Sequence, residues 1–399
     1  MPRFWSVYTA APHRVLFLPG FIQGVLVMTW WLLDLELRFS GDTGLVSTGL
    51  PAPLLHAWLM IYGFFPFFVF GFLFTAAPNW LSGAAVTRPS YVVTMLGLCI
   101  GSMLLYVGQS VPGLVFHLLG WSVALQALWK SLRSAKDPDP RHAWAAWTAL
   151  ALGATGEFLI LSGLLFERWE WLQAGIDLGI WGCLAPLFLT VCHRMIPWFT
   201  SRVVKDYVLV RPYAALWAMW AGCLLHYVLT VTAQSALLWL ADFPTAILIF
   251  WLSARWAFRR SFQARLLAML HVAFLWAGAG FALFAMDSLA RFLALAWSAG
   301  LAPLHALSIG FFGAMLIGMA SRVSLGHSGR ALQADAATWF VFWLIQGVAL
   351  LRVLPDILGE YFPSHMVSLA GLLWLLVMAW WAWKYAPMAW QPRIDGKPG

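Results

Sequence analysis

Histidine is the residue type in this sequence whose number and placement point most clearly to chemistry. The chain of 399 residues contains ten histidines, and several of them lie in or near long apolar segments. A neutral imidazole is a common ligand of haem iron and of copper in proteins. The sequence therefore predicts a haem or metal centre in an apolar environment, although a single histidine is more often a hydrogen-bonded packing residue.

Long apolar segments must position these histidines. The chain is 62% hydrophobic and only 10% charged, whereas a typical soluble domain has about 25% charged residues. A membrane-spanning helix needs about 20 mostly apolar residues, and twelve such segments predict an all-α, polytopic membrane helical bundle that forms a single domain over residues 1–399. The expected spans are 14–35, 53–78, 90–110, 112–132, 142–165, 174–197, 212–236, 241–257, 264–287, 298–321, 335–353 and 365–386.

The basic residues divide unequally between the two ends of the expected spans. With twelve spans both termini lie on one side of the membrane, and that side collects all but four of the 24 Lys and Arg residues. The positive-inside rule places this side, with both termini, in the cytoplasm. Because the net charge of +8 is spread over loops and forms no basic face, nucleic-acid binding is not expected.

Helical rise sorts the histidines into two layers. At 1.5 Å per residue, His56 and His305 both lie roughly 5–12 Å below the outer membrane surface, near the starts of the second and tenth spans. His193, His271 and His327 form an inner group. Two layers fit two redox centres, or one centre with structural histidines. The best axial pair for a haem is then His56 with His305.

Two further features of the spans bear on chemistry. His56, Met60 and Gly63 are spaced i, i+4 and i+7, which predicts one helix face; a thioether suits Cu(I), and close helix packing around glycine explains the same spacing. Glu157 is the acidic residue placed deepest within a span, where it is either a proton relay or a satisfied structural carboxylate. No CxxCH sequence occurs, which excludes a covalently attached c-type haem.

Five sequence blocks, in their expected order along the chain, resemble the NnrS family. They are HAWLMIYG at 56–63, GFLFTAAPNWLSG at 71–83, RMIPWFT at 194–200, LHVAFLW at 270–276 and LHALSIGFFGAMLIGMASRVSLGHSGR at 304–330. The resemblance covers most of the chain. It implies a twelve-span protein of the bacterial inner (cytoplasmic) membrane that is associated with denitrification and nitric oxide.

The resemblance also implies a haem b, copper and a role in tolerating nitrosative stress. Histidines at motif positions are the expected ligands of haem or metal. Arginines at the matching depth are the expected partners of haem propionates; these are Arg38, Arg168, Arg291 or Arg352 for an outer haem, and Arg194, Arg322 and Arg330 for an inner centre. The candidate ligands are His56, His305, His271 and His327, with His193 as a weaker candidate. The other cofactor-binding candidates are Met60, Arg322 and Arg330.

One departure from the family pattern concerns the second span. The family usually reads HAHEM where this chain has HAWLM, so that Trp58 and Leu59 replace a histidine and a glutamate. Because neither side chain binds a metal strongly, the departure argues against copper more than against haem.

Three functions from different classes remain compatible with these residues. The first is a haem protein of the nitric oxide response that binds nitric oxide or transfers electrons, and it is the function that we expect. The second is a membrane oxidoreductase such as a quinol-linked nitric oxide reductase, which would require a quinol as partner. The third is a transporter or metal-handling protein without redox turnover. In all three the lipid bilayer is a partner.

Overall fold

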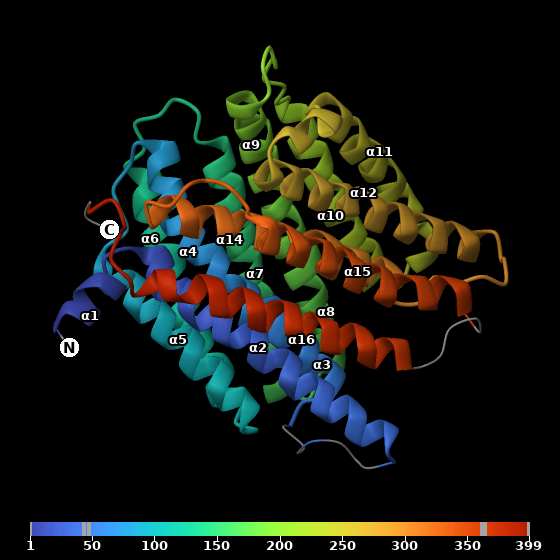
Figure 1. The fold of residues 1–399 in the computed structure, drawn as a ribbon. Coiled ribbons are helices and arrows are strands. Elements are labelled where there is room, and N and C mark those ends of the chain that lie inside the picture. The colour runs from blue at the N-terminus through green and yellow to red at the C-terminus, as the bar shows by residue number, and fades with distance from the viewer. Residues whose placement is uncertain (1, 42–44, 46–48, 360–364, 397–399) are drawn as a thin grey trace. The chain divides into compact units, whose positions relative to one another are not determined.

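The computed structural model describes residues 2–41, 45, 49–359 and 365–396 (Figure 1). In this part of the chain the regular structure is helical, with no strand. Twelve of the described helical segments are long and apolar enough to cross a membrane, which confirms the predicted all-α polytopic bundle. These spans are Pro12–Phe39, Ala52–Leu81, Arg88–Tyr106, Ser110–Arg133, Arg141–Leu165, Trp169–Val203, Tyr213–Val231, Ser235–Arg255, Arg265–Phe292, Ala302–His327, Ala336–Leu358 and Met366–Ala389.

The first of two compact units consists of Met1–Leu184, Val323–Ala331 and Met378–Gly399. Within it α2, α4, α5 and α6 pack against one another, and α7 packs against α8 (Figure 1). Small residues permit the closest approach, because a methyl group on Gly97 of α5 would lie only 2.5 Å from the Cα of Gly120 on α6. The main helices are α1 (Pro2–Tyr8), α2 (Pro12–Phe39), α3 (Ala52–Trp58), α4 (Phe65–Leu81), α5 (Arg88–Tyr106), α6 (Ser110–Arg133), α7 (Arg141–Leu165) and α8 (Trp169–Leu178).

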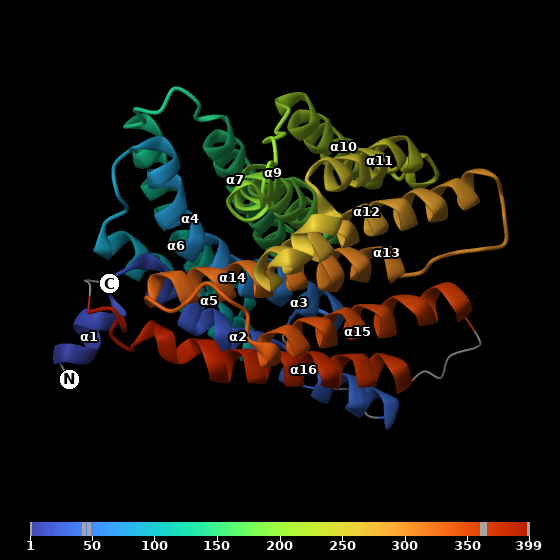
Figure 2. The same cartoon turned by 45° about the horizontal axis from the view of Figure 1, so that its top comes forward.

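The second compact unit consists of Ala185–Arg322 and Leu332–Val377. In this unit α11 packs against both of its neighbours in the sequence, α10 and α12 (Figure 2). The indole Nε1 of Trp276 on α12 donates a hydrogen bond to Gln346 Oε1 on α15 at 2.8 Å, which ties these two helices together. The helices that lie wholly or partly in this unit are α9 (Ala185–Val203), α10 (Tyr213–Val231), α11 (Trp239–Arg255), α12 (Arg265–Phe292), α13 (Ala302–His305), α14 (Ala314–His327), α15 (Ala336–Leu358) and α16 (His365–Tyr385).

Three spans contain a π-helical segment. They are η1 (Leu59–Phe64) between α3 and α4, η2 (Gly179–Leu184) between α8 and α9, and η5 (Ala306–Gly313) between α13 and α14. Among the described spans these three are the most buried. A π segment accommodates one extra residue in a helix, and such segments occur frequently at functional sites.

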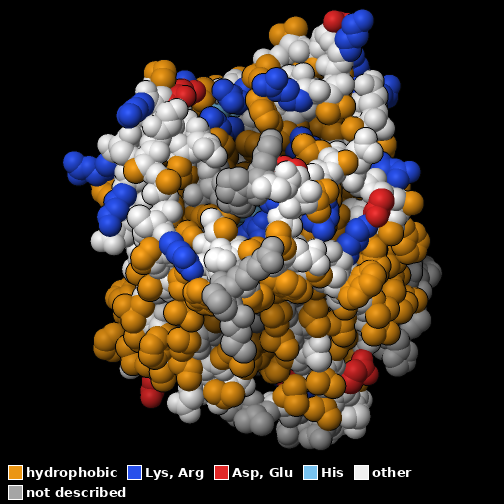
Figure 3. Space-filling model, turned by 60° about the vertical axis from the view of Figure 1, so that its left-hand side comes forward, with side chains coloured by type: hydrophobic (Ala, Val, Ile, Leu, Met, Phe, Trp, Pro, Cys, Tyr) orange, Lys and Arg blue, Asp and Glu red, His pale blue; other side chains and the backbone are white. Residues whose placement is uncertain are grey.

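Hydrophobic side chains cover broad areas of the surface, as expected for helices in contact with lipid. On the face drawn in Figure 3 they form large continuous areas, and most of the visible Lys and Arg side chains lie outside these areas. Large apolar side chains are strongly exposed on several helices, for example Phe340 on α15 and Trp383 on α16. Such exposure would be unfavourable in water and is normal in a bilayer. The cytoplasmic position of the termini and the single-domain organisation stay predictions.

Candidate functional site

His56 and His305 occupy similar local positions in two different spans. Each follows a proline in the first turn of its helix, Pro53 in α3 and Pro303 in α13, and each lies just before a π segment. Proline is well tolerated there because its missing N–H would have no helical partner. Both imidazole side chains are half-buried. One such histidine therefore lies in each compact unit, fixed by a helix start and not enclosed on all sides.

One contact fixes the orientation of each of these two rings, as is usual for a histidine that binds a metal. The ring of Trp31 stacks on that of His56, with centroids 4.3 Å apart and an interplanar angle of 18°. His305 donates a hydrogen bond from Nδ1 to the carbonyl oxygen of Leu301 at 2.9 Å. This bond holds the proton on Nδ1, so the lone pair of His305 lies on Nε2, as in many histidine ligands of metals.

The predicted common face of His56, Met60 and Gly63 stays a prediction, because Met60 and Gly63 lie in a π-helical segment. A methyl group on Gly63 would lie 3.2 Å from Gln23 Nε2 and 3.4 Å from the Trp58 ring, so this glycine faces Gln23 and Trp58. The prediction assumed α-helical spacing, whereas η1 covers Met60 and Gly63 and changes the angle between successive side chains. Met60 is half-buried in the same segment, and its contact with a cofactor stays a prediction.

His271 is fully buried and hydrogen-bonded within the second unit. Its Nε2 lies 3.0 Å from Thr200 Oγ1. Because the Thr200 hydroxyl donates to the carbonyl oxygen of Ile196 at 2.9 Å, it accepts the proton of His271 Nε2. The remaining ring nitrogen, Nδ1, is buried without a hydrogen-bond partner among the described residues. This contact joins α9 to α12, and a ligand role for His271 would have to use Nδ1.

His193 and Arg322 make contacts typical of structural residues. His193 is fully buried and donates from Nε2 to the carbonyl oxygen of Pro212 at 3.0 Å, which fixes the connection between α9 and α10. The guanidinium carbon of Arg322 lies 3.9 Å from the ring centroid of Phe199, a cation–π contact. The ligand role of His193 and the propionate role of Arg322 stay predictions, and their present contacts favour them less than His56 and His305.

His327 and Arg330 lie in the first unit, together with residues that the sequence did not single out. The ring centroids of His327 and His13 are 4.3 Å apart, and Arg330 donates from Nη2 to Gln391 Oε1 at 3.2 Å. His13 comes from the first turn of α2, more than 300 residues earlier in the chain. No spacing signal in the sequence could have brought these residues together.

Glu157 pairs with His117, a histidine that the sequence did not single out. The Nδ1 atom of His117 on α6 lies 2.7 Å and 2.9 Å from the two carboxylate oxygens of Glu157 on α7, and both side chains are fully buried. The Trp58 ring packs edge-on against His117 with centroids 4.9 Å apart. His117 Nε2 is buried without a hydrogen-bond partner among the described residues. Glu157 is thus a paired carboxylate next to η1.

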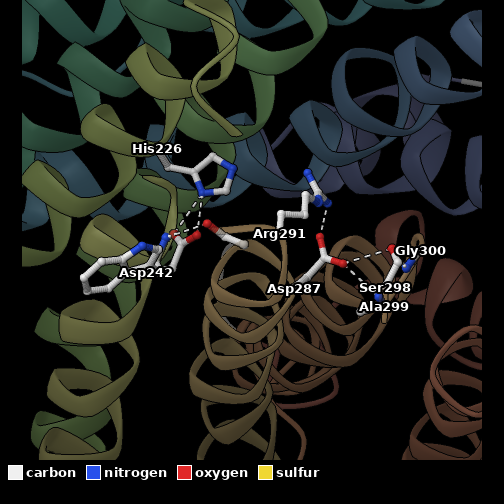
Figure 4. A network of polar contacts seen from close by, with 9 residues as sticks. His226, Asp242, Asp287, Arg291, Ser298, Ala299 and Gly300 are labelled. Atoms are coloured by element: carbon white, nitrogen blue, oxygen red, sulfur yellow. Dashed lines mark hydrogen bonds and ion pairs between the residues drawn. The ribbon is translucent and has the colours of Figure 1, made fainter. Parts of the chain in front are cut away.

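A second carboxylate–imidazole pair lies in the second unit. His226 on α10 is bound through Nδ1 to both carboxylate oxygens of Asp242 on α11 at 2.8 and 3.0 Å (Figure 4). Figure 4 also shows Asp287 on α12, which pairs with Arg291 and accepts hydrogen bonds from the loop at 298–299. Asp242 is fully buried.

These positions fit a haem better than a preformed copper site. A haem needs an imidazole ligand, and His56 and His305, both half-buried, would each offer one. A protein copper site needs several ligands, and no group of three or more His, Cys, Asp or Glu side chains that could hold a metal ion occurs in the described ranges.

A comparison with protein families decides the identity. The model of the NnrS protein family matches residues 7–393, nearly the whole chain. The chain belongs to the NnrS family. This membership confirms the resemblance and supports a nitric-oxide-associated, multi-pass membrane protein. No curated protein matches the sequence.

The two residues that depart from the NnrS motif lie side by side in the interior of the second span. Trp58 and Leu59, which stand where the resemblance predicts a histidine and a glutamate, are fully buried at the junction of α3 and η1. The indole of Trp58 lies against His117, so the departing residue contacts the buried His117–Glu157 pair. In this NnrS chain an aromatic ring fills the place beside that pair.

Proposed function

We propose that this NnrS protein binds haem b in the bacterial inner membrane and acts in the nitric oxide response, by binding nitric oxide or transferring electrons. The observation that carries the proposal is the matched placement of His56 and His305, each half-buried between a helix-starting proline and a π segment. A bound haem would supply an iron that takes up nitric oxide or exchanges one electron.

The residues around the two histidines have distinct tasks in this proposal. The Leu301 carbonyl fixes the tautomer and the orientation of the His305 ring, so that Nε2 is the ligating nitrogen. Trp31 holds the plane of the His56 ring by stacking. Each of the two histidines is by itself a candidate to hold the haem through a ring nitrogen.

A difference spectrum of the detergent-purified protein tests the proposal. We expect a reduced-minus-oxidised spectrum and a pyridine haemochrome of the b type, and a shift of the Soret band when nitric oxide is added. If nitric oxide leaves a b-type spectrum unchanged, the function of the haem is electron transfer and not nitric oxide binding. Consumption of nitric oxide that depends on added quinol would identify a reductase. A purified, folded protein without haem would refute the proposal.

Copper binding is expected to depend on the residue at position 58. Trp58→His would place a second imidazole beside the His117–Glu157 pair, and we expect it to raise bound copper to about one ion per chain after loading with Cu(I). Metal analysis of the purified variant measures this content. Trp58→Phe is the matched control, because it opens similar space without adding a ligand. Equal copper contents of the two variants would show that the pair is not a potential copper site.

A further inference from the structure

Five cationic or imidazole side chains meet in the first compact unit, where the start of α2 lies beside the C-terminal segment. We call this group the Arg14 cluster. It consists of His13, Arg14, His327, Arg330 and Arg393. The carbonyl oxygen and the side-chain Oε1 of Gln391 link it together, since they accept hydrogen bonds from Arg14 at 2.9 Å and from Arg330 at 3.2 Å.

Arg14 is the central and most buried member of the cluster. Only 2% of its surface is exposed. Its Nη1 donates to the carbonyl oxygens of Ala389 and Gln391 at 3.4 and 2.9 Å, so these partners carry no charge. Its Nε is buried without a hydrogen-bond partner among the described residues. A buried cation is strongly unfavourable unless a counter-charge and hydrogen bonds compensate it.

The acidic residue of this region is already engaged. Asp395 accepts hydrogen bonds from Nε and Nη2 of Arg393 at 2.8 and 2.6 Å. Arg393 also acts electrostatically on Arg14 and on His327, and this interaction is repulsive whenever both groups are charged. Arg14 and Arg330 form no ion pair with a carboxylate in the described part of the chain. The cluster therefore has an excess of positive charge.

Three nitrogen atoms in the cluster can donate to a ligand. Arg14 Nε, Arg330 Nη1 and His13 Nδ1 are all buried without a hydrogen-bond partner among the described residues. In addition, α2 begins at Pro12, so the positive end of the dipole of a 28-residue helix lies at His13 and Arg14. Guanidinium groups and helix starts together are typical binding groups for phosphate oxygens.

The location of the cluster indicates the source of the phosphate. His13 and Arg14 lie at the start of a membrane span, and His327 ends another. The adjoining helix α1 has Phe4 and Trp5 each 50% exposed, and exposed aromatic side chains of this kind favour the membrane–water interface. Basic pockets at the cytoplasmic ends of spans bind the headgroups of anionic lipids.

We propose that the Arg14 cluster is a binding site for a phosphate oxyanion, and that its occupant is the headgroup of an anionic phospholipid. The Nε edge of Arg14 and the Nη1 atom of Arg330 neutralise the phosphate, and His13 Nδ1 donates a further hydrogen bond. The positive-inside distribution by itself would explain exposed basic residues such as Arg133 at the end of α6. It does not explain why Arg14 is buried with an unpartnered nitrogen.

Lipid binding to delipidated protein in detergent tests this proposal. The probes are phosphatidylglycerol, phosphatidylcholine and inorganic phosphate, and the readouts are native mass spectrometry and the midpoint of thermal unfolding. Arg330→Gln is the test variant. Among the described residues the Arg330 side chain bonds only the exposed Gln391 side chain, whereas Arg14 also anchors the C-terminal segment. Arg133→Gln is the matched control, an exposed arginine at the end of another span.

We expect phosphatidylglycerol to bind and to raise the unfolding midpoint, with phosphatidylcholine ineffective. Arg330→Gln should weaken phosphatidylglycerol binding about tenfold, the loss of one charge-assisted hydrogen bond, and Arg133→Gln should not. If inorganic phosphate alone stabilises the native protein and not Arg330→Gln, the oxyanion site is supported, and its occupant is free phosphate. Three outcomes would overturn the proposal. They are equal binding of the two lipids, equal effects of the two variants, and no effect of any probe.

Discussion

Replacing His305 with alanine is expected to remove the Soret absorption of this protein or to shift it, while the protein still inserts into the membrane. The same result is expected for His56→Ala. The physical reason is that each substitution deletes an imidazole that is proposed to hold the haem. The measurement is the reduced-minus-oxidised spectrum per mole of purified protein. An unchanged spectrum in both variants would refute the assignment of the ligands.

His193→Ala is the matched control for these two variants. His193 already uses Nε2 to bind the Pro212 carbonyl, and the loss of this buried hydrogen bond should lower stability by about 1–3 kcal/mol without changing the spectrum. A loss of haem in His193→Ala, with normal spectra of the other two variants, would move the centre to α9.

Breaking the His117–Glu157 pair from one side is expected to destabilise the protein by about 3–5 kcal/mol. His117→Phe leaves a fully buried carboxyl without its partner, and Glu157→Leu leaves a buried imidazole in the same situation. The double variant His117→Phe with Glu157→Leu removes both polar groups and should be more stable than either single variant, with a coupling of about 1–3 kcal/mol. Unfolding of the four proteins in detergent measures this cycle.

The surface pair Asp139–Arg141 provides the comparison for this cycle. It joins an exposed arginine to a carboxylate at 2.7 Å, and Arg141→Gln should change stability by less than about 1 kcal/mol. If both single variants of the buried pair were as stable as the native protein, the contact would add no net stability, and the predicted coupling would be refuted.

The spans could be predicted from the sequence because a bilayer imposes a minimum apolar length. The span expected at 142–165 is found at Arg141–Leu165. The π segments could not be predicted, because their spans are apolar on most sides and a uniform pattern does not show the angle between side chains. The start of the eighth span was placed too late, since it was expected at residue 241 and the helical span begins at Ser235.

The positions of the candidate residues along their spans were predictable, but their contacts with other helices were not. Depth along a helix follows from counting residues, which placed His56 and His305 near the ends of their spans. Contact between helices depends on packing that one sequence does not reveal. For this reason the sequence marked Glu157 without its partner His117, and His327 without His13.

The three π segments also have a consequence for how this chain can change during evolution. Each segment accommodates one residue more than an α-helix of the same rise. Deleting one residue within Leu59–Phe64 could therefore convert the segment to α-helix and leave the helices on both sides in place. The same deletion in an ordinary span would rotate every side chain beyond it by about 100°. Relatives of this protein that differ in length by one residue within a span should have the difference at η1, η2 or η5.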